Sequence, residues 1–288
     1  MNIRIHENGW TVMVEDLDLR KATDEQAQEI GRLLAKNTVV VVRGQTLTPR
    51  DEIEFCRKIG KLEDLEPRKD DVGFDGFIVP DSDWHVWRVS GELDEHGRPG
   101  LFGHVSDLDW HANQTANEWR HPIVWLYGVK GTAGSRTSWL NNIMTWQDLS
   151  PQQQDALRDI RMINGYKQGA YSEDHFGKAV DINYHYRPRL VHTNVAGKTG
   201  LFFPFLQIHE IDGMTEDESK EFIETLRDHV LQEKYMYHHD WQDGDVVIAE
   251  QWLGVHKRWR CETIHQRVLH RICLDFAHCD FDQDAVSA

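Results

Sequence analysis

Two histidines and a nearby amide are the residues of this chain that most suggest metal chemistry. His111 and Asn113 lie two positions apart in the run 109–113, and His256 follows an apolar segment that begins after the Gly-Asp pair at 244–245. At the end of a strand, residues i and i+2 point to the same side. We therefore expect His111 and Asn113 to face one metal ion, with His256 presented to it from a loop.

Arg271 is the second chemical signal, because it interrupts the apolar run 267–274. An arginine inside an apolar strand is costly unless its charge is paired. Its planar fork suits bidentate binding of a carboxylate. Two histidines and a carboxylate with open positions form the non-haem iron(II) site of oxygenases. The pattern thus predicts a metal site beside a carboxylate-binding arginine.

Four helix starts are predicted by capping residues. Thr23 and Thr215 each begin a capping box, Thr48 precedes a proline at the first helical position, and Ser150 combines both features. We expect helices to run to about residue 36, from 49 to about 59, briefly after 151, and after 215 through a segment with apolar residues at four-residue spacing.

Strand signals lie between these helices. The β-branched run 38–42 is too apolar to be half exposed, so it predicts a buried strand. Further strands are predicted at 123–129, 190–195, 200–205, 246–248 and 268–276. No linker or repeat divides the chain. We therefore expect one α+β domain over residues 1–288, built around a β-sandwich or barrel.

Composition narrows the possible partners. The formal net charge of −16 over 288 residues argues against nucleic acid or an anionic membrane surface as a partner, since both are anionic. The four cysteines form no C-x-x-C pair, which argues against a cysteine zinc site, and no segment resembles a signal peptide or a membrane span. We expect a cytoplasmic protein that acts on a small molecule, with homo-oligomerisation left open.

The sequence resembles the taurine dioxygenase-like (TauD/TfdA) family of iron(II)- and 2-oxoglutarate-dependent dioxygenases. The resemblance extends over nearly the whole chain and rests on the segments 38–48, 59–63, 110–111, 134–137, 197–202, 244–256 and 267–271. It implies a double-stranded β-helix (a cupin-like jelly roll) flanked by helices. It also implies that His111 and His256 bind Fe(II), and that Thr137 and Arg271 contact 2-oxoglutarate. The implied reaction uses O2, oxidises a small-molecule substrate, and releases succinate and CO2.

The sequence departs from the family at the third metal ligand. Asn113 stands where the family has Asp, and residues 249–252 differ from the family's usual Trp-Asp-Asn-Arg. Four hypotheses follow. Asn113 or a water completes the iron site; a halide such as chloride occupies the position, as in related halogenases; Asp109 or Glu250 supplies the carboxylate; or the protein is a catalytically inactive binding relative.

Substrate contacts are harder to predict. The segment 66–103 precedes the histidine motif, where the family has a pocket-covering loop, so Trp84 and Trp87 are candidates to line the pocket. Phe203 and Phe205 are further candidates, although packing is the simpler role for them. Acidic residues in the covering segment suggest a basic or zwitterionic substrate, although a solvated loop is the simpler explanation for them; they are Asp70, Asp71, Asp75, Asp81 and Asp83.

Overall fold

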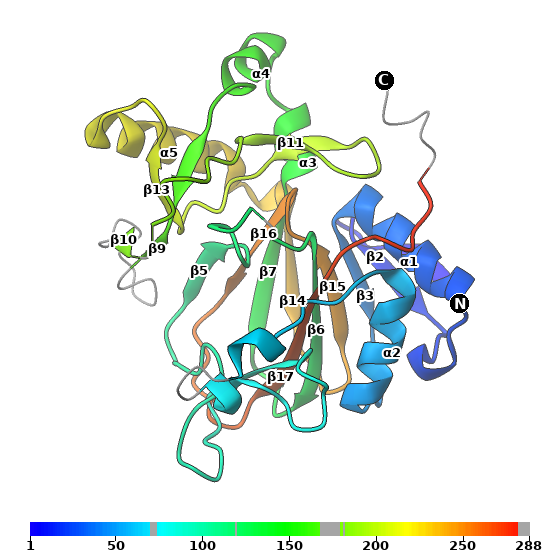
Figure 1. Cartoon of the computed structure of the whole chain (residues 1–288). Coiled ribbons are helices and arrows are strands. Elements are labelled where there is room, and N and C mark those ends of the chain that lie inside the picture. Colours follow the sequence, from blue (N-terminus) through cyan, green and yellow to red (C-terminus); the bar gives the residue numbers. More distant parts are fainter. Residues whose placement is uncertain (70–73, 119, 168–178, 181, 282–288) are drawn as a thin grey trace.

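Two sheets, antiparallel except for one parallel pair of strands in the larger sheet, face each other in the centre of the molecule (Figure 1). The computed structural model describes residues 1–69, 74–118, 120–167, 179–180 and 182–281. The larger sheet has seven strands in the order β1 (Asn2–Ile5), β2 (Val12–Glu15), β3 (Val39–Val42), β15 (Val246–Glu250), β6 (Ile123–Lys130), β17 (Val268–Leu274) and β4 (Trp87–Ser90). The smaller sheet has four strands in the order β14 (Met236–Asp240), β7 (Arg136–Asn141), β16 (Gly254–Arg258) and β5 (Leu108–His111).

Helices and short two-stranded sheets surround these sheets. The helices are α1 (Asp24–Asn37), α2 (Pro49–Ile59), α3 (Asn142–Gln147), α4 (Pro151–Leu157) and α5 (Glu216–Val230), with short 3-10 turns at Leu19–Lys21, Glu66–Arg68, Phe74–Phe77 and Glu233–Tyr235. The two-stranded pairs are β8 (Met162–Asn164) with β13 (Ile208–Ile211), β9 (Tyr166–Lys167) with β10 (Ala179–Val180), and β11 (Val191–Thr193) with β12 (Thr199–Leu201). Among the helices of the described residues, none is long and apolar enough to cross a membrane.

The predicted capping residues do begin four of the helices. Thr23, Thr48, Ser150 and Thr215 each accept a hydrogen bond from the third helical N–H and close a reciprocal capping box. The helix α3 was not predicted, because it is only six residues long and follows β7 directly, with Asn141 as its cap. Its short, largely buried sequence offers no amphipathic pattern to detect.

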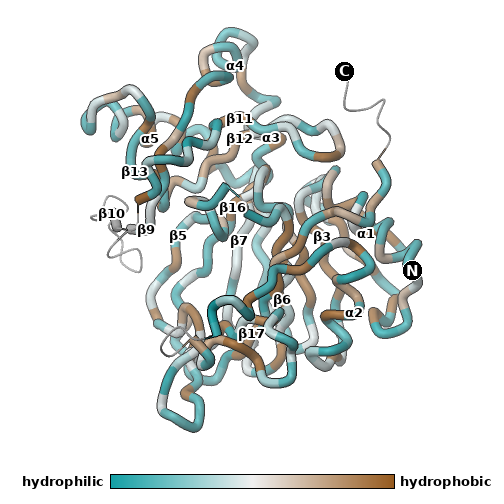
Figure 2. The backbone as a smooth tube through the Cα atoms, in the orientation of Figure 1, coloured by the Kyte–Doolittle hydropathy of each residue, from teal (hydrophilic) through white to brown (hydrophobic). Residues whose placement is uncertain are grey.

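The four valines of β3 explain how the layers form. All four are buried, as the sequence predicted, and they alternate between two cores. Val40 and Val42 belong to the core beneath α1 and α2, whereas Val39 and Val41 belong to the core between the sheets. β3 is drawn as a hydrophobic stretch in Figure 2. Because successive side chains of a strand point to opposite faces, a strand covered on both sides is apolar throughout.

Some predicted element bounds were wrong. His256 lies within β16 and not on a loop, and the strand predicted at 200–205 is the short β12, which ends at Leu201. β17 ends at Leu274, two residues before the predicted end at 276. The chain after Leu201 leaves the sheet because Phe202, Phe203 and Phe205 enter the core beneath α5 instead of pairing with a strand.

Arg120 joins three segments that surround the centre of the molecule. Its Nη1 donates to the hydroxyl of Tyr186 at 2.7 Å and its Nη2 donates to His192 Nε2 at 3.3 Å. The guanidinium also lies 3.9 Å from the ring centre of Phe202 and 5.0 Å from that of Trp252. A guanidinium can only donate, so His192 Nε2 must accept and the ring must be neutral. Burial and the charge of Arg120 lower the pKa of His192 to about 4.

We predict that His192 makes the protein less stable in mild acid. In the unfolded chain its pKa returns to about 6.5, so the unfolded state binds a proton below that pH while the folded state does not until about pH 4. The free energy of unfolding should therefore fall by roughly 1–2 kcal/mol between pH 7 and pH 5 through this residue. Urea unfolding at both pH values should show a smaller decrease for His192→Gln than for the wild type. His96→Gln is the control, since His96 is mostly exposed. An unchanged pH dependence in His192→Gln would contradict the assignment.

Candidate active site

His111 and His256 are brought together by strand pairing in the smaller sheet. His111 ends β5 and His256 lies in β16, and the two residues are partners in the antiparallel register. Their ring centres are 4.2 Å apart with the planes tilted by 49°. The ring of Trp139 stacks on His256 at 6.3 Å and 24°. The predicted histidine pair is therefore formed, with a rigid aromatic neighbour.

Both histidines are held in the state that binds metals. His111 Nδ1 donates to the backbone carbonyl of Asp109 at 2.6 Å, which leaves Nε2 with a lone pair. Burial lowers the pKa of His111 to about 4 and lowers the pKa of His256 well below its ordinary value. Both rings are thus neutral near pH 7. Within the described residues, however, no group of three or more His, Cys, Asp or Glu side chains is arranged to hold a metal ion.

A β-bulge explains why Asp109 is not part of this pair. His256 pairs with His111, but Arg258 pairs with Leu108, so β5 has one extra residue between these two pairs. Such a bulge reverses the alternation of side chains along a strand. Asp109 instead makes an ion pair with Lys257 at 3.2 Å. The hypothesis that Asp109 supplies the missing carboxylate, which assumed an ideal strand, is therefore wrong.

Glu250 does not supply the carboxylate either. Its two oxygens accept the backbone N–H groups of Trp252 and Leu253 at 3.1 and 2.7 Å, so the side chain closes the turn after β15. Burial raises the pKa of Glu250 to about 7. No described acidic side chain takes the place of the expected Asp at position 113.

Asn113 is held by a fixed set of hydrogen bonds. Its backbone N–H donates to Gln251 Oε1 at 2.9 Å, and the same oxygen accepts from Asn113 Nδ2 at 2.6 Å. Because the backbone N–H can only donate, the Gln251 atom opposite it must be the oxygen, and the Asn113 atom facing that oxygen must be the NH2 group. Asn113 Oδ1 then accepts from Arg271 Nη1 at 2.9 Å. The amide oxygen expected at the metal is engaged by an arginine.

Arg271 has a second neighbour besides Asn113. Its guanidinium carbon lies 4.7 Å from the ring centre of Trp87, and its Nε is buried with no hydrogen-bond partner among the described residues. Arg271 is on β17, and the adjacent His270 points to the opposite side, where it contacts Glu52 of α2. Arg271 thus reaches the space between the sheets, as the strand pattern predicts.

Arg267 is a buried cation that the sequence did not single out. It is only 1% exposed, and it makes no ion pair with any described carboxylate. Its Nε donates to Ser135 Oγ at 3.1 Å, while Nη1 has no partner among the described residues. Burial, followed by the nearby charge of Arg258, lowers the pKa of Arg267 to about 9. The available sequence signal was a second arginine at the start of the same apolar segment as Arg271.

A small cavity between the sheets connects these groups. It is lined by both histidines, Asn113 and residues of both sheets; those that bear on the chemistry are Thr137, Arg258, Arg267 and Arg271. Thr137 Oγ1 accepts from Trp241 Nε1 at 2.9 Å. Arg258 donates from Nη1 to the carbonyl of Phe102 at 2.6 Å and is also hydrogen-bonded to His104 and Ser106. The histidine pair thus shares one cavity with three arginines, which suits a dianionic ligand.

A larger cavity of about 380 Å³ lies on the other side of His111 and Asn113. Trp87, a candidate pocket residue from the sequence, lines it together with Phe74, Phe77 and Phe102. Trp84 packs instead against the cluster of Leu65, Phe74 and Trp87. The structure places Phe203 and Phe205 in the core beneath α5, where packing is their role. Asp70 and Asp71 lie outside the described residues.

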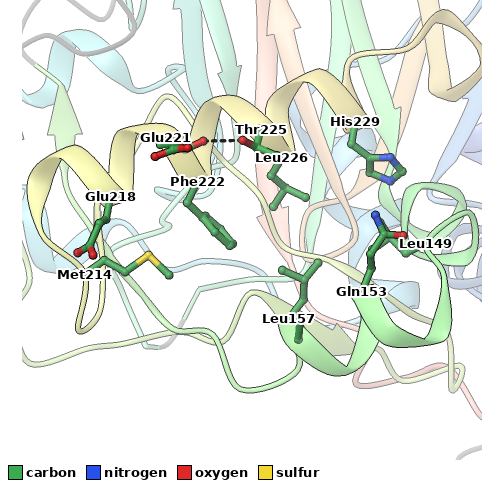
Figure 3. A pocket seen from close by; sticks show the side chains of 11 residues that line it. Leu149, Gln153, Leu157, Met214, Glu218, Glu221, Phe222, Thr225, Leu226 and His229 are labelled. Atoms are coloured by element: carbon green, nitrogen blue, oxygen red, sulfur yellow. Dashed lines mark hydrogen bonds between the residues drawn. The ribbon is translucent and has the colours of Figure 1, made fainter.

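The surface also has a groove of about 520 Å³ between α4 and α5 (Figure 3). Leu157, Phe222 and Leu226 line it, and Thr225 donates a hydrogen bond to the Glu221 carbonyl at its edge. Neither histidine of the pair, nor any of the arginines beside them, contributes to this groove. The candidate chemistry therefore belongs to the two cavities at His111.

Known proteins with similar sequences include dioxygenases. The chain is 24% identical over 280 residues to the alpha-ketoglutarate-dependent 2,4-dichlorophenoxyacetate dioxygenase of Cupriavidus pinatubonensis, covering 90% of this chain and 92% of that protein. It is 22% identical over 262 residues to pentalenolactone F synthase of Streptomyces arenae, covering 85% of each.

Solved structures confirm the predicted fold. AAD-2, solved in complex with Mn(II) and N-oxalylglycine, has a TM-score of 0.78 at 20% identity and covers 95% of this chain and 96% of its own. A putative alpha-ketoglutarate-dependent taurine dioxygenase from Burkholderia xenovorans has a TM-score of 0.72 at 22% identity, covering 92% and 86%. The α+β architecture with a double-stranded β-helix core is therefore the fold of this chain.

The family assignment rests on nearly the whole chain. The model of the taurine catabolism dioxygenase TauD, TfdA family matches residues 7–273. This range includes His111, His256, Arg267 and Arg271. This match confirms the enzyme class expected from the sequence, an oxidoreductase of the dioxygenase type. The chain belongs to the TauD/TfdA family of dioxygenases.

Proposed function

We propose that this protein is an iron(II)- and 2-oxoglutarate-dependent oxygenase that oxidises a small molecule. The observation that carries the proposal is the buried guanidinium of Arg267, which has no acidic partner among the described residues and lines a cavity shared with His111 and His256. A buried charge is normally paired. A carboxylate of 2-oxoglutarate would provide that pair, and the dioxygenase names of the relatives agree with this ligand.

The residues present fit this cofactor and co-substrate in part. Two neutral imidazoles suit a divalent iron, and they would hold it at the junction of the two cavities. When bound, the iron supplies the activation of O2 that removes CO2 from 2-oxoglutarate and leaves succinate. Arg267 and Thr137 would orient the 2-oxoglutarate, while the larger cavity would receive the substrate. We also propose that residues 1–288 form a single domain. The four cysteines are all free thiols, which agrees with the proposal of a reducing, cytoplasmic setting.

Two arginines compete for the 2-oxoglutarate carboxylate. Arg271 was the candidate from the sequence, yet its Nη1 is engaged by Asn113, whereas Arg267 Nη1 has no described partner. We assign the carboxylate to Arg267 and infer that Arg271 faces the larger cavity, which it also lines.

We predict that Arg267→Met weakens 2-oxoglutarate binding by about 100-fold or more, because it removes a buried charge-assisted pair. Isothermal titration of the Mn(II)-loaded protein measures the dissociation constant. The same variant should be at least as stable as the wild type without ligand, since an unpaired buried charge has been removed. Arg271→Met is the matched control and should change 2-oxoglutarate binding only a few-fold. If Arg271→Met weakens 2-oxoglutarate binding more than Arg267→Met does, the carboxylate is bound by Arg271 instead.

Asn113 is proposed as a bridge between Gln251 and Arg271, with a small molecule such as water at the remaining iron position. We predict that Asn113→Asp lowers the stability of the metal-free protein by about 1–3 kcal/mol, because a carboxylate oxygen would replace the NH2 group that lies 2.6 Å from Gln251 Oε1. Urea unfolding measures this difference. Asn117→Asp adds the same charge at the same cavity without contacting Gln251 and should have a smaller effect. Equal stability of Asn113→Asp and the wild type would contradict the bridge.

The reaction itself is tested by product analysis. With Fe(II), 2-oxoglutarate and O2, we expect succinate to form, and His111→Ala and His256→Ala to abolish it because each removes a metal ligand. Mass spectrometry with and without chloride then separates oxygen insertion from halogenation; we expect the same oxygenated product in both, since Arg271 and Gln251 already satisfy the Asn113 amide. Absence of succinate from the wild type would favour an inactive binding protein.

A further inference from the structure

The larger cavity contains a buried carboxylate that the proposed reaction does not use. Glu63 follows α2 and lines this cavity with an exposed fraction of 7%. No described lysine or arginine forms an ion pair with it. His121 lies close enough for its charge to interact with Glu63, but burial lowers the pKa of His121 and so favours its neutral form. A buried carboxylate without a cation is costly, so its position in the cavity that His111 lines calls for an explanation.

Two N–H donors hold Glu63, and the Cys273 thiol is a further hydrogen-bond neighbour of its carboxylate. Trp87 Nε1 donates to Oε2 at 3.1 Å, and Gln114 Nε2 donates to Oε1. The orientation of the Gln114 amide is determined by the backbone N–H of His121, which donates to Gln114 Oε1 at 2.9 Å and leaves only the NH2 group to face Glu63. Both carboxyl oxygens therefore act as acceptors, which is the arrangement of an ionised carboxylate.

The backbone of Gln114 supports a functional role for this arrangement. Its φ of 61° is in the left-handed region, which is unfavourable for residues other than glycine. Phe102, which lines the same cavity, has a φ of 55°. Strained backbone of this kind persists where the surrounding structure holds it, and it is common at binding sites.

The cations that line the cavity are directed elsewhere. Arg271 donates to Asn113 and lies over the ring of Trp87, and Arg68 lies 4.2 Å from the ring centre of Phe74. Trp87 thus stands between the two charges, with Arg271 over its face and Glu63 at its N–H edge. The remainder of the lining is aromatic or aliphatic; it includes Phe77, Leu101, Leu108 and Leu206.

We propose that Glu63 is a specificity-determining residue that binds a protonated amine of the substrate. The inference rests on the proposed function, because it takes the larger cavity as the substrate site. An ammonium group against Glu63 would compensate the buried charge, and the aromatic lining would hold an apolar body beside His111. The substrate class is a small amine with an aromatic or aliphatic body.

Matched compounds test this inference directly. Dissociation constants are measured by isothermal titration of the Mn(II)- and 2-oxoglutarate-loaded protein, without turnover. L-Phenylalanine is compared with 3-phenylpropanoate, and phenethylamine with 2-phenylethanol, so that the members of each pair differ in the ammonium group. We expect each amine to bind about tenfold or more tightly than its partner, as expected for a desolvated charge pair.

Two variants separate the charge of Glu63 from its hydrogen bonds. Glu63→Gln should remove the amine preference. Trp87→Phe removes one donor to Glu63 but keeps the charge, so it should keep the preference even if overall binding weakens. The proposal is overturned if no amine in the wild type binds more tightly than its partner, or if Glu63→Gln retains the preference. Succinate formation is measured independently, so a failure of the amine assignment is distinguishable from a failure of the proposed oxygenase function.

Discussion

The pairing of β16 with β5 and β7 is the constraint on which the rest of the site depends. It sets His256 opposite His111 in register, and the bulge in β5 turns Asp109 away to Lys257. A regular strand would have placed an acidic side chain on the same side as the histidine. The chemistry of the centre therefore follows from one irregularity in a hydrogen-bonded ladder. The packing of Trp139 against His256 then holds the pair in place.

The two cavities beside His111 hold an unusual distribution of charge. Arg267 and Glu63 are both buried, and neither forms an ion pair with a described residue. In a protein interior such groups are stable only with hydrogen bonds or a bound partner of opposite charge. The hydrogen bonds from Arg267 to Ser135 and from Trp87 and Gln114 to Glu63 hold the groups in position without neutralising them. A ligand of opposite charge can therefore gain binding free energy by pairing with charges that folding has already removed from water.

Asn113 shows how a substitution within a motif is accommodated by its neighbours. An amide has both a donor and an acceptor, and here the donor matches Gln251 while the acceptor matches Arg271. A carboxylate would satisfy Arg271 but oppose the Gln251 oxygen, which is itself fixed by the backbone N–H of Asn113. Gln251 lies in the segment 249–252, which also departs from the family pattern. The two departures thus meet at one hydrogen bond, and they are best understood as a single change.

The sequence by itself determined the helix starts, the buried strand β3, the family, and the pair His111 and His256. These follow from local signals, because a capping box, an all-valine run and a motif each depend on nearby residues only. The roles of Asp109, Asn113, Arg267 and Glu63 were decided by the tertiary structure. A bulge changes which side a residue faces, and a partner such as Gln251 is distant in sequence from Asn113. Both Arg267 and Arg271 are buried, and they differ in that Arg271 Nη1 donates to Asn113 while Arg267 Nη1 has no partner among the described residues. This difference is a property of the folded chain alone, since it depends on every segment that surrounds the two side chains.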